Sequence, residues 1–180
     1  YALIPIFGMN NAMASFTGQN VGAEKYDRVH RGWRSATLMS VCASLIISSL
    51  LYILAPDFAL LFSLSGEALD QAVAYQRFTS YCIILFATYM PTSGLLQGAG
   101  DVIWTSVSSF STLGIRVVAS YVMAYALDVG SAACWLNIPF GWGLGVLMSM
   151  PRYFSKAWMK KRVVGSVLSP GEQLAEEAAE

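Results

Sequence analysis

Long uncharged stretches separated by short polar segments dominate this chain. Five such stretches run along it, free of charged residues except for one arginine in the fourth: 1–23, 35–56, 78–100, 105–127 and 129–151. A helix rises about 1.5 Å per residue, so about 20 apolar residues cross a hydrocarbon core of about 30 Å. The pattern therefore predicts five transmembrane spans, near 1–18, 35–56, 78–98, 105–127 and 130–150.

Within each stretch the apolar residues are continuous and do not alternate with polar ones. A bilayer admits only helices and closed barrels, and the strands of a barrel alternate with a period of two. The predicted fold class is therefore all-α, a polytopic transmembrane helical bundle. The polar segment 57–77 is predicted to hold a short surface element, a break at 65–66 and the start of the next helix at Glu67.

Composition also indicates a membrane protein. The chain is 56% hydrophobic and 12% charged, and its mean hydropathy is +0.52. In soluble domains about a quarter of all residues are charged. This chain therefore has too few charged residues to cover a surface that faces water. The expected surroundings are a lipid bilayer, with no nucleic acid as partner.

The charged residues are segregated, and their distribution predicts the orientation of the spans. Segment 20–34 carries four basic residues against two acidic ones, and segment 152–162 carries five basic residues and no acid. Segment 57–77 is acidic, with three acids against Arg77. Because cytoplasmic loops are rich in Lys and Arg, segment 20–34 and the C-terminal tail are predicted to be cytoplasmic, in a multi-pass protein of the cell (plasma) membrane.

A group of small residues at 94–101, GLLQGAGD, joins the third span to the fourth. A phosphate cradle is excluded here, because the G-x-G-x-x-G pattern, a following Lys-Ser/Thr pair and a preceding strand are all missing. The segment is predicted to be a tight turn, in which Asp101 caps the next helix by accepting its free amide hydrogens. Two G-x-x-x-G pairs, which let helix backbones approach closely, lie in the spans: Gly94 with Gly98, and Gly141 with Gly145.

Two motifs give the chain a family resemblance. The first is FTGQNVGAEKYDRVHR at 16–31, directly after the first span, and the second is GLLQGAGDVIWTSV at 94–107. Together with the order of the spans, they resemble the C-terminal lobe of multidrug and toxic compound extrusion (MATE) transporters over residues 1–160. The resemblance implies that 1–160 is most of one six-helix lobe of a twelve-helix transporter, and that 161–180 is a cytoplasmic tail.

The resemblance implies secondary active transport. Such transporters export organic, often cationic, compounds in antiport with H⁺ or Na⁺, by alternating access between two lobes. The chain is then a partial transporter, whose partners are small organic substrates and a missing N-terminal lobe. Since no Asp or Glu lies within the predicted spans, the coupling ion is expected to bind in that missing lobe. No cofactor, metal or catalytic residue is expected in this chain.

Two groups of residues are candidates for the wall of a substrate cavity. Adjacent amides in the first span need partners or water in hydrocarbon, and aromatic rings in the third span can attract cations. The candidates are Asn10, Asn11, Met13 and Phe16 in the first span, and Tyr81, Thr88, Tyr89 and Thr92 in the third. The alternative is that both groups are ordinary packed faces, with their hydroxyl groups bonded to the helix.

Arg116 stands in the middle of the fourth span, where a charge costs about 2.5–3.5 kcal/mol on insertion scales. It is either part of a substrate or gating surface, or a structural residue that bonds polar groups within the bundle. The structural role is favoured, because a guanidinium repels a cationic substrate. His30, in the basic segment, is predicted to be a solvated residue near the start of a helix.

Two other functions fit the same pattern. A lipid-linked oligosaccharide flippase of the same wider fold needs a wide, basic cavity, and only Arg116 favours it. A non-transporting membrane structural protein has the same composition. A membrane enzyme is not expected, because no cluster of His, Asp and Glu lies near the end of a span in the sequence.

Overall fold

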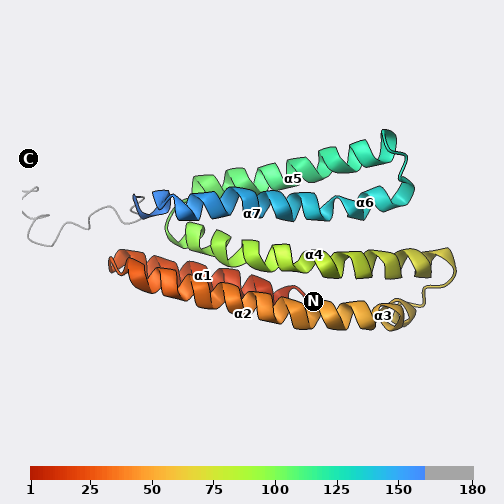
Figure 1. Cartoon of the computed structure of the whole chain (residues 1–180), viewed down its shortest axis with the longest axis horizontal. Coiled ribbons are helices and arrows are strands. Elements are labelled where there is room, and N and C mark those ends of the chain that lie inside the picture. The colour runs from red at the N-terminus through yellow and green to blue at the C-terminus, as the bar shows by residue number, and fades with distance from the viewer. Residues whose placement is uncertain (161–180) are drawn as a thin grey trace, which may run out of the picture.

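The computed structural model describes residues 1–160, and its helices lie side by side in an elongated bundle (Figure 1). In chain order the elements are α1 (Ile4–Gly22), α2 (Tyr26–Ile53), α3 (Ala55–Leu61), α4 (Glu67–Gly98), α5 (Val102–Tyr125), the 3-10 turn η1 (Gly130–Ala132), α6 (Ala133–Leu136), α7 (Ile138–Phe154) and the 3-10 turn η2 (Ala157–Lys160). No strand occurs within 1–160, so the predicted all-α class is confirmed. The predicted tail, 161–180, lies outside the described residues.

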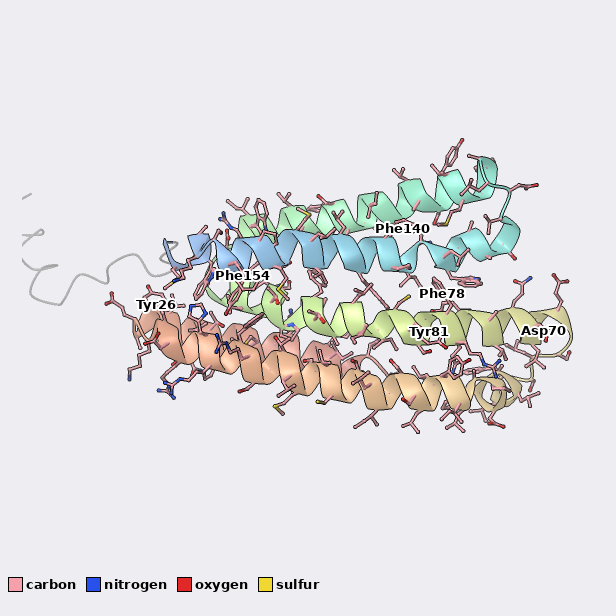
Figure 2. The ribbon with its side chains drawn as sticks, in the orientation of Figure 1. Tyr26, Asp70, Phe78, Tyr81, Phe140 and Phe154 are labelled. Carbon is pink, nitrogen blue, oxygen red and sulfur yellow. The ribbon has the colours of Figure 1, made fainter. Side chains whose placement is uncertain are left out.

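Helix α4 lies in the middle of the bundle. It packs against α1 and α2 on one side and against α7 on the other, and α5 packs on α7 (Figure 1). The α1–α2 turn, the α4–α5 turn and the end of α7 lie at one end of the bundle, and α3 and α6 lie at the other. Figure 2 shows Tyr26 and Phe154 at the first end and Asp70 at the opposite one. We call the first end the basic end, because it gathers the basic segments 20–34 and 152–160.

Most residues of each predicted span are helical. Among the described residues, 1–160, three helical stretches are long and apolar enough to cross a membrane by length and composition: Tyr26–Ile53, Val102–Tyr125 and Gly130–Phe154. The stretches at 1–18 and 78–98 form α1 and the second part of α4, and their crossing stays a prediction. Helices α2 and α4 begin well before the uncharged runs, because residues that precede these runs can also favour a helix. In α2 these are the arginines, and in α4 they are Ala, Gln, Glu and Arg.

The loop before α4 follows the predicted pattern. Helix α3 is the short element, and α4 begins at Glu67 after a break. Gly66 precedes the helix with φ 57°, a left-handed conformation that glycine adopts without steric cost.

The last span is interrupted at Asn137. Pro139 sits in the first turn of α7 and has no N–H to donate, so it cannot continue the hydrogen bonds of α6. The side chain of Asn137 donates from Nδ2 to the carbonyls of Cys134 at 2.8 Å and Ala133 at 3.2 Å. These bonds satisfy carbonyl groups at the interruption, as an apolar environment requires.

Helices α1 and α4 touch backbone to backbone. A Cβ added at Gly94 would overlap the backbone carbonyl of Asn10, and one added at Gly98 would overlap that of Ala14. The close approach predicted for this G-x-x-x-G pair is therefore confirmed. The second pair, Gly141 and Gly145, lies instead against the side chains of Arg116 and Tyr89.

The outer faces of α2 and α5 are apolar. Leu38, Ile46 and Ile53 of α2 are each at least 65% exposed, and Phe110 and Tyr121 of α5 are 75% and 65% exposed. A surface so rich in large apolar side chains suits a hydrocarbon environment and not water.

Candidate functional site

The polar candidates of α1 and α4 form hydrogen bonds inside the bundle. Asn10 is 9% exposed, and its Nδ2 donates to the backbone carbonyl of Met90 at 2.9 Å. Thr92 is fully buried, accepts a hydrogen bond from Trp33 Nε1 at 3.0 Å, and donates one to the carbonyl of Thr88 at 3.2 Å. These groups therefore hold α1, α2 and α4 together.

Three further candidates pack against neighbouring helices. Tyr89 is buried, and its ring lies against the backbone of Gly145 in α7. Met13 is buried in the core at the basic end, where Phe16 packs against the same cluster. Met13 and Phe16 also line a groove of about 290 Å³ between α1 and α2.

The remaining candidates lie further out. Tyr81 is 68% exposed, and its ring lies 5.4 Å from that of Tyr52 between centroids. Asn11 is exposed, and Thr88 is half-buried with its hydroxyl donating to the carbonyl of Ile84 at 2.8 Å. The structure thus divides the eight candidates into packed residues and the exposed pair Asn11 and Tyr81. Their role in binding a substrate stays a prediction.

Arg116 is tied to the interruption in the last span. Its Nε donates to Oδ1 of Asn137 at 2.9 Å, and Nδ2 of Asn137 donates to the hydroxyl of Ser120 at 2.7 Å. Asn137 is 4% exposed, so one buried amide joins α5 to the junction of α6 and α7. A groove of about 500 Å³ runs beside this pair, between α5 and α6. The contact supports the structural role of Arg116.

Asp101 occupies the residue before α5, as predicted, but its role differs from the prediction. Its side chain makes no capping hydrogen bond to α5. Instead, Oδ2 accepts a hydrogen bond from Nε of Arg152 at 2.6 Å. Asp101 is fully buried and Arg152 is 22% exposed, and a buried carboxylate is more stable beside a cation than beside amides alone. The capping prediction is therefore wrong in its chemistry.

Aromatic side chains pack together at the basic end, among them His30, Trp33, Tyr153 and Trp158. Trp33 and Tyr153 stack with centroids 4.1 Å apart, and Nδ1 of His30 lies 2.7 Å from Oη of Tyr153. Trp158 is fully buried and donates from Nε1 to the carbonyl of Tyr153 at 3.1 Å. The predicted solvated His30 is thus half-buried and bonded to α7.

Sequence reasoning missed Asn137, Arg152 and Tyr153, which provide the partners of these sites. Of these three residues, Asn137 is the one whose role the sequence indicates most clearly, because it is a lone amide two residues before a proline inside an uncharged stretch. The partners of Arg152 and Tyr153 are 51 and 123 residues away in the sequence. Within 1–160, no three His, Cys, Asp or Glu side chains lie close enough together to hold a metal ion.

The helices, their apolar outer faces and the buried polar pairs define a polytopic membrane bundle. A family model described as MatE matches residues 1–122. This match covers more than half of the chain, and the chain therefore belongs to the MatE family of integral membrane proteins.

Individual relatives agree with this assignment. The chain is 23% identical over 164 residues to the probable multidrug resistance protein YoeA of Bacillus subtilis (strain 168), a match over 91% of this chain and 35% of that protein. It is 24% identical over 165 residues to Protein DETOXIFICATION 14 of Arabidopsis thaliana, over 90% of this chain and 33% of that protein. The chain thus spans about a third of the length of the relatives it matches.

A solved structure shares the fold. It is described as the inward-facing conformation of a multidrug resistance MATE family transporter of the MOP superfamily, and it matches with a TM-score of 0.78 and 21% identity. The match covers 91% of this chain and 38% of that one. The fold implied by the two sequence motifs is therefore confirmed.

Proposed function

We propose that this chain is part of an efflux transporter that exports organic, often cationic, compounds in antiport with H⁺ or Na⁺ by alternating access. The observation that carries the proposal is the MatE match over residues 1–122, joined to the fold likeness to a multidrug transporter. In the proposed setting the protein lies in the plasma membrane, with segment 20–34 and the tail on the cytoplasmic side.

The proposed coupling site lies outside this chain, in a second lobe. No Asp or Glu occurs within the five predicted spans. Asp101, at the edge of a span, is bound to Arg152, and a carboxylate that is already paired with a guanidinium is a poor site for a proton or a sodium ion.

The proposed substrate contacts are the exposed candidates. Tyr81 offers an accessible aromatic face beside Tyr52, and such faces attract organic cations. The flippase alternative gains no support, because its basic group, Arg116, bonds to Asn137 at the junction of the last span.

A transport assay in proteoliposomes tests the proposal. The chain is reconstituted alone, and together with the part of the Bacillus relative that it does not match. An outward-directed or inward-directed gradient of H⁺ or Na⁺ is then imposed, and movement of a fluorescent organic cation is followed. We expect transport driven by one of the two gradients, and only from the two-part protein. Transport that neither gradient drives would contradict antiport.

A further inference from the structure

A groove of about 700 Å³ opens at the basic end, between the first turns of α2 and the end of α7. We call it the basic groove. Its charged wall consists of Arg31, Arg34 and Lys156 against a single acid, Asp27. All four side chains are exposed, so the groove presents a net positive charge to whatever lies beside the bundle end.

Lys156 has a left-handed backbone at the edge of the basic groove. Lys156 follows the last turn of α7 with φ 56°, and its N–H donates to the carbonyl of Tyr153 at 3.2 Å. Glycine is the usual residue at such a position, because a Cβ is disfavoured in the left-handed region. Two roles are open to its ammonium group, which is exposed beside the groove: contact with a ligand there, or with the carbonyl end of α7.

The rest of the groove is aromatic, with a buried or half-buried floor and an exposed rim. His30 and Tyr153 form the floor, and their hydrogen bond of 2.7 Å joins α2 to α7. Phe154 forms part of the rim and is 68% exposed. A ligand of this groove therefore meets cations and a large apolar ring side by side, which suits an amphipathic anion.

We propose that the basic groove binds the phosphate of an anionic phospholipid, with Arg31, Arg34 and Lys156 around the headgroup and Phe154 beside the start of the acyl chains. The planar guanidinium of arginine presents paired N–H groups that match the geometry of phosphate oxygens. Arg34 directly precedes the uncharged run 35–56, which places the groove at the level of the headgroups. The proposal requires a membrane but does not depend on transport.

Titration of the full chain in mild detergent, followed by native mass spectrometry, tests this site. The probes are phosphatidylglycerol and phosphatidylcholine with the same acyl chains. We expect phosphatidylglycerol to bind at least about tenfold more tightly, since each basic side chain near a membrane surface contributes roughly a fivefold gain for anionic lipid. Equal affinities for the two lipids would overturn the proposal.

Matched variants distinguish a site from general surface charge. We expect Arg34→Gln and Lys156→Gly each to weaken phosphatidylglycerol binding about fivefold. Arg28→Gln removes an exposed basic residue of the same helix that does not line the groove, and it should change binding less than twofold. An equal loss in Arg28→Gln would show that only the overall charge matters, and would overturn the site.

Lys156→Gly also separates binding from folding, because glycine relieves the left-handed backbone. We expect an unchanged or higher melting temperature together with weaker lipid binding. A lower melting temperature with unchanged lipid selectivity would assign Lys156 to the carbonyl end of α7 and overturn its place in the site. In a further experiment, millimolar inorganic phosphate is added as a competitor, and it should not displace phosphatidylglycerol. Displacement would contradict lipid as the ligand and would assign the groove to free phosphate.

Discussion

Arg152 donates a hydrogen bond from Nε to Oδ2 of Asp101 at 2.6 Å, and this ion pair ties the start of α5 to the end of α7. The guanidinium also lies over the ring of Trp104, 5.0 Å from its centroid, and Trp104 donates to the carbonyl of Met148 at 3.3 Å. The two helices are thus joined by a charge pair, a cation–π contact and a hydrogen bond at the same end of the bundle.

Asp101→Asn is expected to lower the stability of the folded chain. It removes the negative charge and leaves the guanidinium of Arg152 without its ionic partner. Removing one member of a fully buried pair costs about 3–5 kcal/mol. We expect about 2 kcal/mol here, because Arg152 is 22% exposed. Thermal unfolding in detergent, followed by circular dichroism, measures the change.

Asp128→Asn is the matched control for this prediction. Asp128 is exposed and has φ 48°, a conformation that asparagine also tolerates. The melting temperature of Asp128→Asn should equal that of the unchanged chain. If Asp101→Asn melts at the same temperature as this control, the ion pair does not stabilise the bundle.

Gly98→Ala is expected to disrupt the packing of α1 on α4. The added Cβ meets the carbonyl of Ala14, which belongs to backbone and cannot move aside. Overpacking of this kind costs about 1–3 kcal/mol. Gly143→Ala makes the same change in α7, where nothing lies within 4 Å of the new Cβ, and should be neutral or slightly stabilising. Thermal unfolding of both variants checks the difference, and equal melting temperatures would contradict the close contact.

Asn137→Ala is expected to destabilise the end of the bundle that holds α6. The change removes the partner of Arg116 and Ser120, together with the bonds to two carbonyls of α6. Hydrogen bonds between membrane helices contribute about 0.6 kcal/mol each on average, so we expect a loss of about 2 kcal/mol. Asn11→Ala, at an exposed position, serves as the control.

Arg116→Leu tests the same hydrogen bond by removing its donor. Since Arg116 acts by bonding Asn137, the variant should lower the yield of folded protein more than it changes substrate preference. The yield is measured by size-exclusion chromatography in detergent, and preference by transport of two competing cations in the two-part protein. A normal yield with altered preference would assign Arg116 to the substrate surface.

Tyr81→Ala is expected to weaken the binding of aromatic cations without loss of stability, because Tyr81 is 68% exposed. Tyr89→Ala is expected to lower stability by about 3 kcal/mol, as truncation of a buried aromatic residue does. The two tyrosines therefore separate binding from folding. Equilibrium binding of a fluorescent cation to each variant, at a temperature where both are folded, measures the effect. Unchanged binding in Tyr81→Ala would remove that residue from the proposed substrate surface.

The sequence predicts the helical bundle because the cost of placing charge in hydrocarbon produces long uncharged runs. The uncharged runs alone do not give the helix ends. Helix α4 begins at Glu67, as the break at 65–66 predicts, although its uncharged run begins only at 78. The hydrocarbon restricts where charges lie, and it does not restrict where a helix begins. For the interruption at Asn137, the lone amide two residues before Pro139 is an indication, but it does not specify a break, because a proline is also an ordinary first-turn residue of a helix.

Contacts between residues of different helices could not be predicted from the sequence. Asp101 before a helix is a common cap, and only the approach of α7 brings Arg152 within reach. The spacing of Thr88 and Thr92 showed that they share a helix face, but not that Trp33 of α2 covers it. Such contacts depend on how three helices cross, which no single stretch of residues specifies.

The contact of Gly94 and Gly98 with the backbone of α1 has a consequence for motion. There is no room for a Cβ at either glycine, so sliding one helix along the other would bring residues that carry a Cβ against these carbonyl groups. We therefore expect α1 and α4 to move as one rigid body in any rearrangement of the bundle. Two probes fixed on them should keep a constant separation while the rest of the protein moves.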